Sequence, residues 1–130
     1  MTWLSRELIT SPYYIGLCTD EKAFNADLKN MRIPKKERPE FLINEYSNAT
    51  VHFFENTDGK NCAIVCIHKK QPKKITRAQI DCLLVHEAVH IWQRVKENIG
   101  ERFPSLEFEA YSIQSIAQSL IEEYHRKVPK

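Results

Sequence analysis

The amino-acid sequence predicts an α+β fold, in which a small sheet packs on a long helix that is followed by a second one. The sheet is expected from a β-hairpin over about 49–68, where two strand-like segments flank a polar turn. Apolar residues recur at helical spacing over about 76–98 and again over about 105–126. The length of 130 residues matches one domain, so we expect residues 1–130 to form a single minimal domain.

The shorter elements follow from local composition. Residues 49–55 and 61–68 are the two hairpin strands, and the second is apolar on both faces, which is typical of a strand covered by a helix. Residues 13–18 form a further short strand, giving a small mixed or antiparallel sheet. Two short helices are expected, over 2–9 and 20–31.

Capping residues mark the ends of the two long helices. Thr76 with Gln79 fits a capping box at the start of the first helix, and Gly100 fits its C-terminal stop. Ser105 is the expected N-cap of the second helix.

Composition excludes several classes of protein. The chain is 42% hydrophobic and 28% charged with a net charge of +2, which is too mild for a dedicated nucleic-acid binder. No apolar run approaches the ~18 to 20 residues that cross a bilayer, and residues 1–7 lack the pattern of a signal peptide. We therefore expect an intracellular protein with reduced thiols, in which Cys62 and Cys66 are buried on one face of their strand.

The first long helix contains the motif HExxH, formed by His86, Glu87 and His90. Residues four apart lie on one helix face, so the two imidazoles can both reach a zinc ion at about 2.0 to 2.1 Å. Glu87 leans to the side of this face, where it can take a proton from a water that zinc has activated. The motif therefore predicts His86 and His90 as zinc ligands and Glu87 as a catalytic residue.

Chance and context both favour this interpretation. From the composition, about 0.02 matches to HExxH are expected at random. On a helical wheel the polar residues form one wedge, interrupted only by Leu83; its members are Gln79, His86, Glu87, His90, Gln93 and Arg94. The other sides are mostly apolar, so this wedge must face a cleft or carry satisfied partners. In the alternative interpretation the histidines are core residues bonded to backbone, and Glu87 pairs with Arg94 or a lysine.

A catalytic zinc needs a third protein ligand, and the second long helix offers Glu107 and Glu109. Glu109 shares its face with apolar residues, where a carboxylate is costly unless it is paired or bound to a metal. Glu107 lies on a solvated face. We therefore predict Glu109 as the third ligand and keep Glu107 as the alternative. A buried salt bridge, for instance to Arg94, is the competing role for Glu109.

At these residues the sequence resembles the zincin metallopeptidases, in the gluzincin arrangement of HExxH plus a glutamate from the next helix. The strings His-Glu-Ala-Val-His-Ile-Trp-Gln and Glu-Phe-Glu-Ala-Tyr-Ser-Ile-Gln are similar to small phage- and prophage-type metallopeptidases. The resemblance implies hydrolysis of peptide bonds, with Glu87 as general base and then general acid. It also implies that the edge of the 49–68 hairpin aligns the substrate backbone by strand addition.

The sequence departs from the larger gluzincins at two points. Ile113 stands where an acid often orients a ligand histidine, so that partner must come from elsewhere, such as Asp81 or a backbone carbonyl. Tyr111 points away from the face of Glu109 and is not an assured donor to the oxyanion. Other candidate donors, for which packing is the competing role, are Tyr13, Tyr14, His52, His68 and His125.

Two other functions compete with a peptidase acting on a peptide or protein substrate. The chain could be a zinc-stabilised binding module with weak or no catalysis, in which the metal supports the fold. It could also bind nucleic acid through the basic loops at 35–38 and 69–74, with an affinity that falls steeply with salt. We disfavour the second because these loops lack interleaved aromatic residues.

Overall fold

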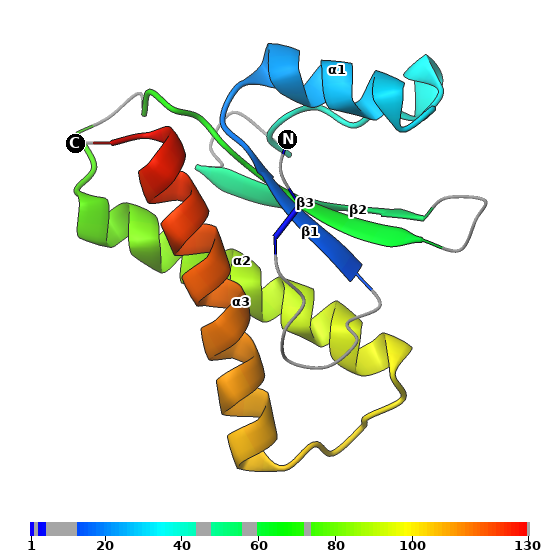
Figure 1. Ribbon diagram of the computed structural model, residues 1–130, viewed down its shortest axis with the longest axis vertical. Coiled ribbons are helices and arrows are strands. Elements are labelled where there is room, and N and C mark those ends of the chain that lie inside the picture. Colours follow the sequence, from blue (N-terminus) through cyan, green and yellow to red (C-terminus); the bar gives the residue numbers. More distant parts are fainter. Residues whose placement is uncertain (2, 5–12, 44–47, 56–59, 72–73, 130) are drawn as a thin grey trace.

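The computed structural model describes residues 1, 3–4, 13–43, 48–55, 60–71 and 74–129, and its elements confirm an α+β fold. The described residues form three strands and three α-helices (Figure 1). Their order is β1 (Tyr13–Cys18), α1 (Glu21–Asn30), β2 (Ala49–Glu55), β3 (Asn61–Ile67), α2 (Arg77–Asn98) and α3 (Leu106–Lys127). A single 3₁₀ turn, Lys35–Glu37, occupies the basic loop that follows α1.

The sheet is mixed and has the strand order β1-β3-β2. The predicted hairpin is confirmed, since β2 pairs antiparallel with β3 from Ala49 opposite Ile67 to Glu55 opposite Asn61. β1 lies parallel to β3 on its other side. Among the described strands, none pairs with the other edge of β2, and that edge borders the candidate site.

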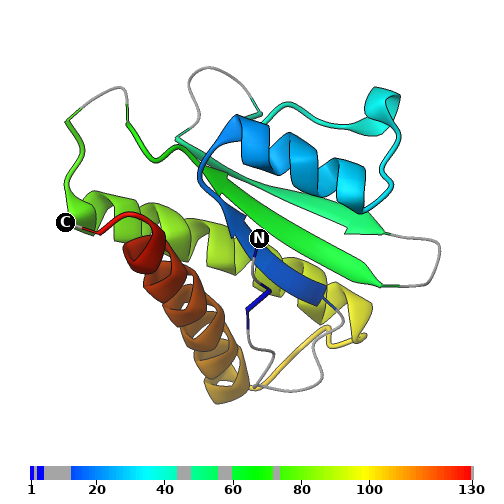
Figure 2. The ribbon, with the colours of Figure 1, turned by 45° about the horizontal axis from the view of Figure 1, so that its top comes forward.

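Helices cover both faces of the sheet, as Figures 1 and 2 show. The larger core lies between the sheet and the pair α2 and α3, and the smaller core lies between the sheet and α1. Six of the seven residues of β3 are buried, which confirms the covered position that its apolar sequence predicts. Cys62 and Cys66, both on β3, are buried free thiols.

The predicted caps fix the two long helices. The Thr76 hydroxyl accepts from the Gln79 backbone N–H while the Gln79 side chain accepts from the Thr76 backbone, which completes the capping box. The Ser105 hydroxyl accepts from the Phe108 N–H at 3.2 Å. Gly100 has a φ of 73°, a left-handed conformation that favours glycine and ends α2.

One expectation is modified and another lies outside the described residues. Val85 and Cys82 on α2 are exposed, although both lie on the sides of this helix that the sequence shows as apolar. The helix expected over 2–9 falls largely on residues that the structure does not describe. None of the described helices has the length and apolar composition that crossing a membrane requires.

Candidate functional site

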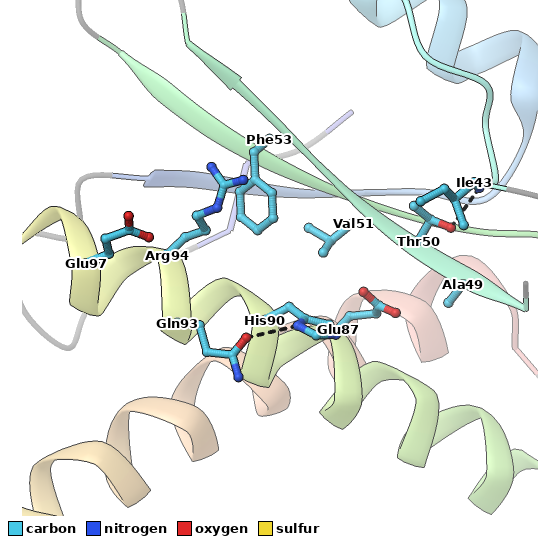
Figure 3. Close-up of a pocket in the computed structure, with 10 residues that line it drawn as sticks. All are labelled: Ile43, Ala49, Thr50, Val51, Phe53, Glu87, His90, Gln93, Arg94 and Glu97. Atoms are coloured by element: carbon cyan, nitrogen blue, oxygen red, sulfur yellow. Dashed lines mark hydrogen bonds between the residues drawn. The ribbon is translucent and has the colours of Figure 1, made fainter.

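A groove runs between the free edge of β2 and the polar wedge of α2. It consists of two adjoining hollows of about 540 and 460 Å³, which share Ala49 and Glu87 in their walls. All six polar residues of the wedge line it, together with Leu83, which confirms that the wedge faces a cleft. We call this hollow the α2–β2 groove, and Figure 3 shows the part that contains Glu87 and His90.

The two histidines of the motif meet at the groove. Their Nε2 atoms are 3.2 Å apart, and their ring centroids are 4.8 Å apart. Two nitrogens bound to one tetrahedral zinc at about 2.0 to 2.1 Å would lie about 3.3 Å from each other. The pair therefore has the spacing of two ligands on one metal ion.

Gln93 orients the second of these imidazoles. Its Oε1 lies 3.0 Å from His90 Nδ1, and Figure 3 draws this bond as a dashed line. Because an amide oxygen only accepts, Nδ1 is the donor, and in the neutral imidazole the lone pair is then on Nε2, which faces His86. Metal-binding histidines commonly hold their second ring nitrogen in this way.

Glu87 is the buried carboxylate of the site, with 7% of its surface exposed. Burial raises the pKa of its carboxyl, while the nearby His86 and His90 and a hydrogen bond from the Val51 backbone act in the opposite direction. Figure 3 shows the carboxylate beneath β2. A carboxylate held in this way is placed to accept a proton from a molecule in the groove.

Glu109, on α3, contacts a face of α2 other than the one that carries the histidine pair. Its Oε2 accepts from the Trp92 indole N–H at 2.9 Å and lies 3.8 Å from Lys96 Nζ. Trp92 is two residues after His90, which turns it about 200° around the helix. Among the described residues, no third histidine, cysteine or carboxylate joins His86 and His90 in a group able to hold a metal ion.

The role of Glu109 as third ligand therefore stays a prediction, and its carboxylate contacts Trp92 and Lys96 instead of the histidine pair. The expected competing role, a salt bridge, is present in another form, because the partner is Lys96 rather than Arg94. Glu107 is exposed, as the helical wheel indicates.

The other candidate residues lie away from the groove. Asp81 binds His125 Nε2 at 2.8 Å and links α2 to α3, so it does not orient His86 or His90. His52 and His68 face the small core beside Phe41, on the other side of the sheet. The described residues that line the groove include none of the candidate oxyanion donors, namely Tyr13, Tyr14, His52, His68 and His125.

Sequence reasoning missed three features of the groove. The sequence puts Gln93 in the polar wedge, and its bond to His90 could have been expected from it, since residues three apart on a helix are neighbours. The Val51 backbone contact with Glu87 and the stacking of Arg94 on Phe53 depend on how β2 sits over α2, and no local signal in the sequence reveals that.

Comparison with known proteins gives no independent assignment, since no protein-family model, no curated protein and no solved structure matches the chain. The groove combines two imidazoles at the spacing of two metal ligands, one buried carboxylate and a strand edge with no described neighbour. In proteins generally, imidazole nitrogens are zinc ligands and strand edges can pair with extended peptides.

Proposed function

We propose that this protein is a zinc-dependent metallopeptidase in which His86, His90 and Glu109 hold the metal ion. The observation that carries the proposal is the 3.2 Å separation of the two Nε2 atoms beside the buried Glu87. Zinc is the metal we infer, since imidazole and carboxylate are among its preferred ligands. Glu109 would have to exchange its contacts with Trp92 and Lys96 for the metal.

A bound zinc ion supplies Lewis acidity toward the scissile carbonyl and the attacking water. Glu87 takes the proton of that water on its carboxylate and then delivers it to the nitrogen of the leaving amine. Gln93 would orient His90 through the 3.0 Å bond to Nδ1, which leaves Nε2 available to hold the metal. The free edge of β2 binds the peptide backbone as an added strand.

The second candidate is a zinc-stabilised binding module without turnover. The contacts of Glu109 favour it, because a carboxylate bonded to Trp92 and Lys96 leaves only two protein ligands at the histidine pair. Such a site binds metal without the fixed open position that catalysis requires.

Metal content and peptide cleavage, measured on the same protein preparations, test the proposal. We expect one zinc per chain in wild type and in Glu87→Gln, with chelator-sensitive cleavage of a peptide mixture by wild type only. His86→Ala should lose both the zinc and the cleavage. Glu109→Gln should weaken zinc binding at least about tenfold, the loss typical even of residues that only support a ligand.

Glu107→Gln is the matched control for Glu109→Gln, since it removes the same charge from an exposed position two residues away. Full zinc binding by the Glu109 variant and loss in the Glu107 variant would transfer the third-ligand role to Glu107. One zinc without cleavage of any peptide would favour the binding module, and absence of zinc from wild type would contradict both functions.

A further inference from the structure

The two ends of the α2–β2 groove differ in chemistry. On the side of His86 the wall has no charged side chain besides those of the motif, and it is formed by the small, apolar or uncharged side chains of Asn48, Ala49, Ala78, Gln79, Cys82 and Leu83. On the side of His90 the wall carries Arg94 and Glu97. A peptide lying along the groove would therefore meet different surroundings on either side of Glu87.

Arg94 is held in place by an aromatic ring. Its guanidinium carbon lies 4.5 Å from the centroid of the Phe53 ring, and Figure 3 shows the guanidinium leaning onto that ring. Stacking on an aromatic face fixes the plane of a guanidinium and leaves its N–H groups available to a ligand. Within the described part of the chain, no carboxylate, Glu97 included, forms an ion pair with Arg94.

The strand and the helix place this guanidinium relative to the reacting bond. Val51 contacts Glu87 and so marks the centre of the groove. Phe53 is two residues farther along β2 and faces the same side, about 7 Å away. Arg94 is seven residues after Glu87, about 10 Å along α2. β2 and α2 therefore run in the same direction along the groove, and Arg94 lies beyond the centre.

Strand addition fixes the direction of a bound peptide. An antiparallel pair with β2 forms the more stable ladder and places the N-terminal part of the peptide beside Phe53. We propose that Arg94, supported by Phe53, forms a subsite for an acidic side chain about two residues to the N-terminal side of the cleaved bond. This inference rests on the proposed peptidase and names its preferred substrate class, peptides with Asp or Glu at that position.

Matched peptides that carry Glu, Gln or Lys at this position provide the test. We expect kcat/KM for the Glu peptide to exceed that for the Gln peptide by about tenfold, the size of a charge-assisted hydrogen bond. Arg94→Gln should remove this preference, and Arg94→Glu should reverse it in favour of Lys. Arg102→Gln removes the same charge from an exposed loop outside the groove and should leave the preference intact.

Binding gives a readout that does not depend on turnover. Fluorescence anisotropy of the same labelled peptides with Glu87→Gln should show the same order of affinities, and adding Arg94→Gln should abolish it. Equal binding of the three peptides would overturn the subsite even if cleavage occurs. A Glu preference in binding without cleavage by wild type would keep the subsite and overturn the peptidase. A Glu preference on the C-terminal side of the cleaved bond would overturn the direction assigned here.

Discussion

At the level of single residues, the two glutamates of the proposed site have opposite surroundings. Glu87 is 7% exposed, and its polar neighbours are the imidazoles of His86 and His90 and the backbone N–H of Val51. Glu109 has 35% of its side chain exposed and is bonded to Trp92 and near Lys96. Among the described residues, no ion pair holds the first carboxylate, which suits the proton transfer proposed for it. The second carboxylate would have to give up its existing contacts before it could bind the proposed metal ion.

His52 makes the stability of the protein depend on pH. Burial lowers the pKa of its imidazole, although hydrogen bonds to the Phe41 and Glu40 backbone oppose this. Its Nε2 lies 2.8 Å from the Phe41 carbonyl, and its ring stacks on Phe24. Unfolding therefore lets His52 bind a proton more readily, so its contribution to stability is present above the unfolded pKa of about 6.5 and is lost as pH falls through the folded value.

We expect the free energy of unfolding to fall more between pH 7.5 and pH 5.5 in wild type than in His52→Gln. Glutamine keeps an N–H donor for the Phe41 carbonyl but does not titrate. The substitution therefore removes the proton that residue 52 takes up on unfolding and keeps the hydrogen bond. Urea denaturation at the two pH values measures the difference. Equal losses in the two proteins would show that His52 does not titrate between its folded and unfolded states.

At the level of the elements, local signals in the sequence account for most of the fold. The capping box at Thr76, the N-cap at Ser105 and the left-handed Gly100 set the ends of α2 and α3 to within a residue or two. The polar wedge predicted the groove because an amphipathic helix fixes which side chains share a face. These features depend only on residues a few positions apart.

What the sequence could not reveal depends on contacts between distant segments. The parallel pairing of β1 with β3 joins residues 13–18 to 61–66, and no local pattern specifies that partner. Glu109 meets Trp92 because of how α3 is rotated about its own axis against α2. The helical wheel predicts which face of α3 carries Glu109, but it does not predict which face of α2 Glu109 contacts. Whether Glu109 can be the third ligand depends on that contact with α2.

The contact between α2 and α3 can be tested with Trp92→Phe. Trp92 is 2% exposed, its ring packs edge-on against Phe108, and its indole N–H is donated to Glu109. Phenylalanine preserves much of the packing but not the donor, so we expect the free energy of unfolding to fall by about 1–3 kcal/mol. Because Glu109 is released, zinc affinity should stay the same or rise, as isothermal titration calorimetry would measure.

Phe108→Leu is the control for that change, since it removes the ring contact and keeps the indole donor. It should lower stability without raising zinc affinity. If Trp92→Phe weakens zinc binding as much as Glu109→Gln does, the indole hydrogen bond supports the metal site rather than competing with it.

At the level of the whole molecule, the links between α2 and α3 are unevenly distributed. The C-terminal end of α3 is joined to α2 by Asp81 with His125 at 2.8 Å and by Arg77 with the Val128 carbonyl at 2.5 Å, and Lys127 joins it to the Leu17 carbonyl of β1. Figures 1 and 2 show the other ends of the two helices farther apart, joined by residues 99–105. Glu109 lies near this less restrained end, where a shift of α3 disturbs the fewest of these links.

A metal ion held jointly by α2 and α3 would add a link at that end, so zinc should stabilise the native protein. At a free zinc concentration of 100 Kd, binding to the native state alone adds about 2.7 kcal/mol. For a chain of 130 residues this corresponds to a rise in Tm of about 10 °C. Differential scanning calorimetry should show the rise in wild type and in Glu87→Gln, and none in His86→Ala. A similar rise in His86→Ala would mean that zinc binds elsewhere on the protein.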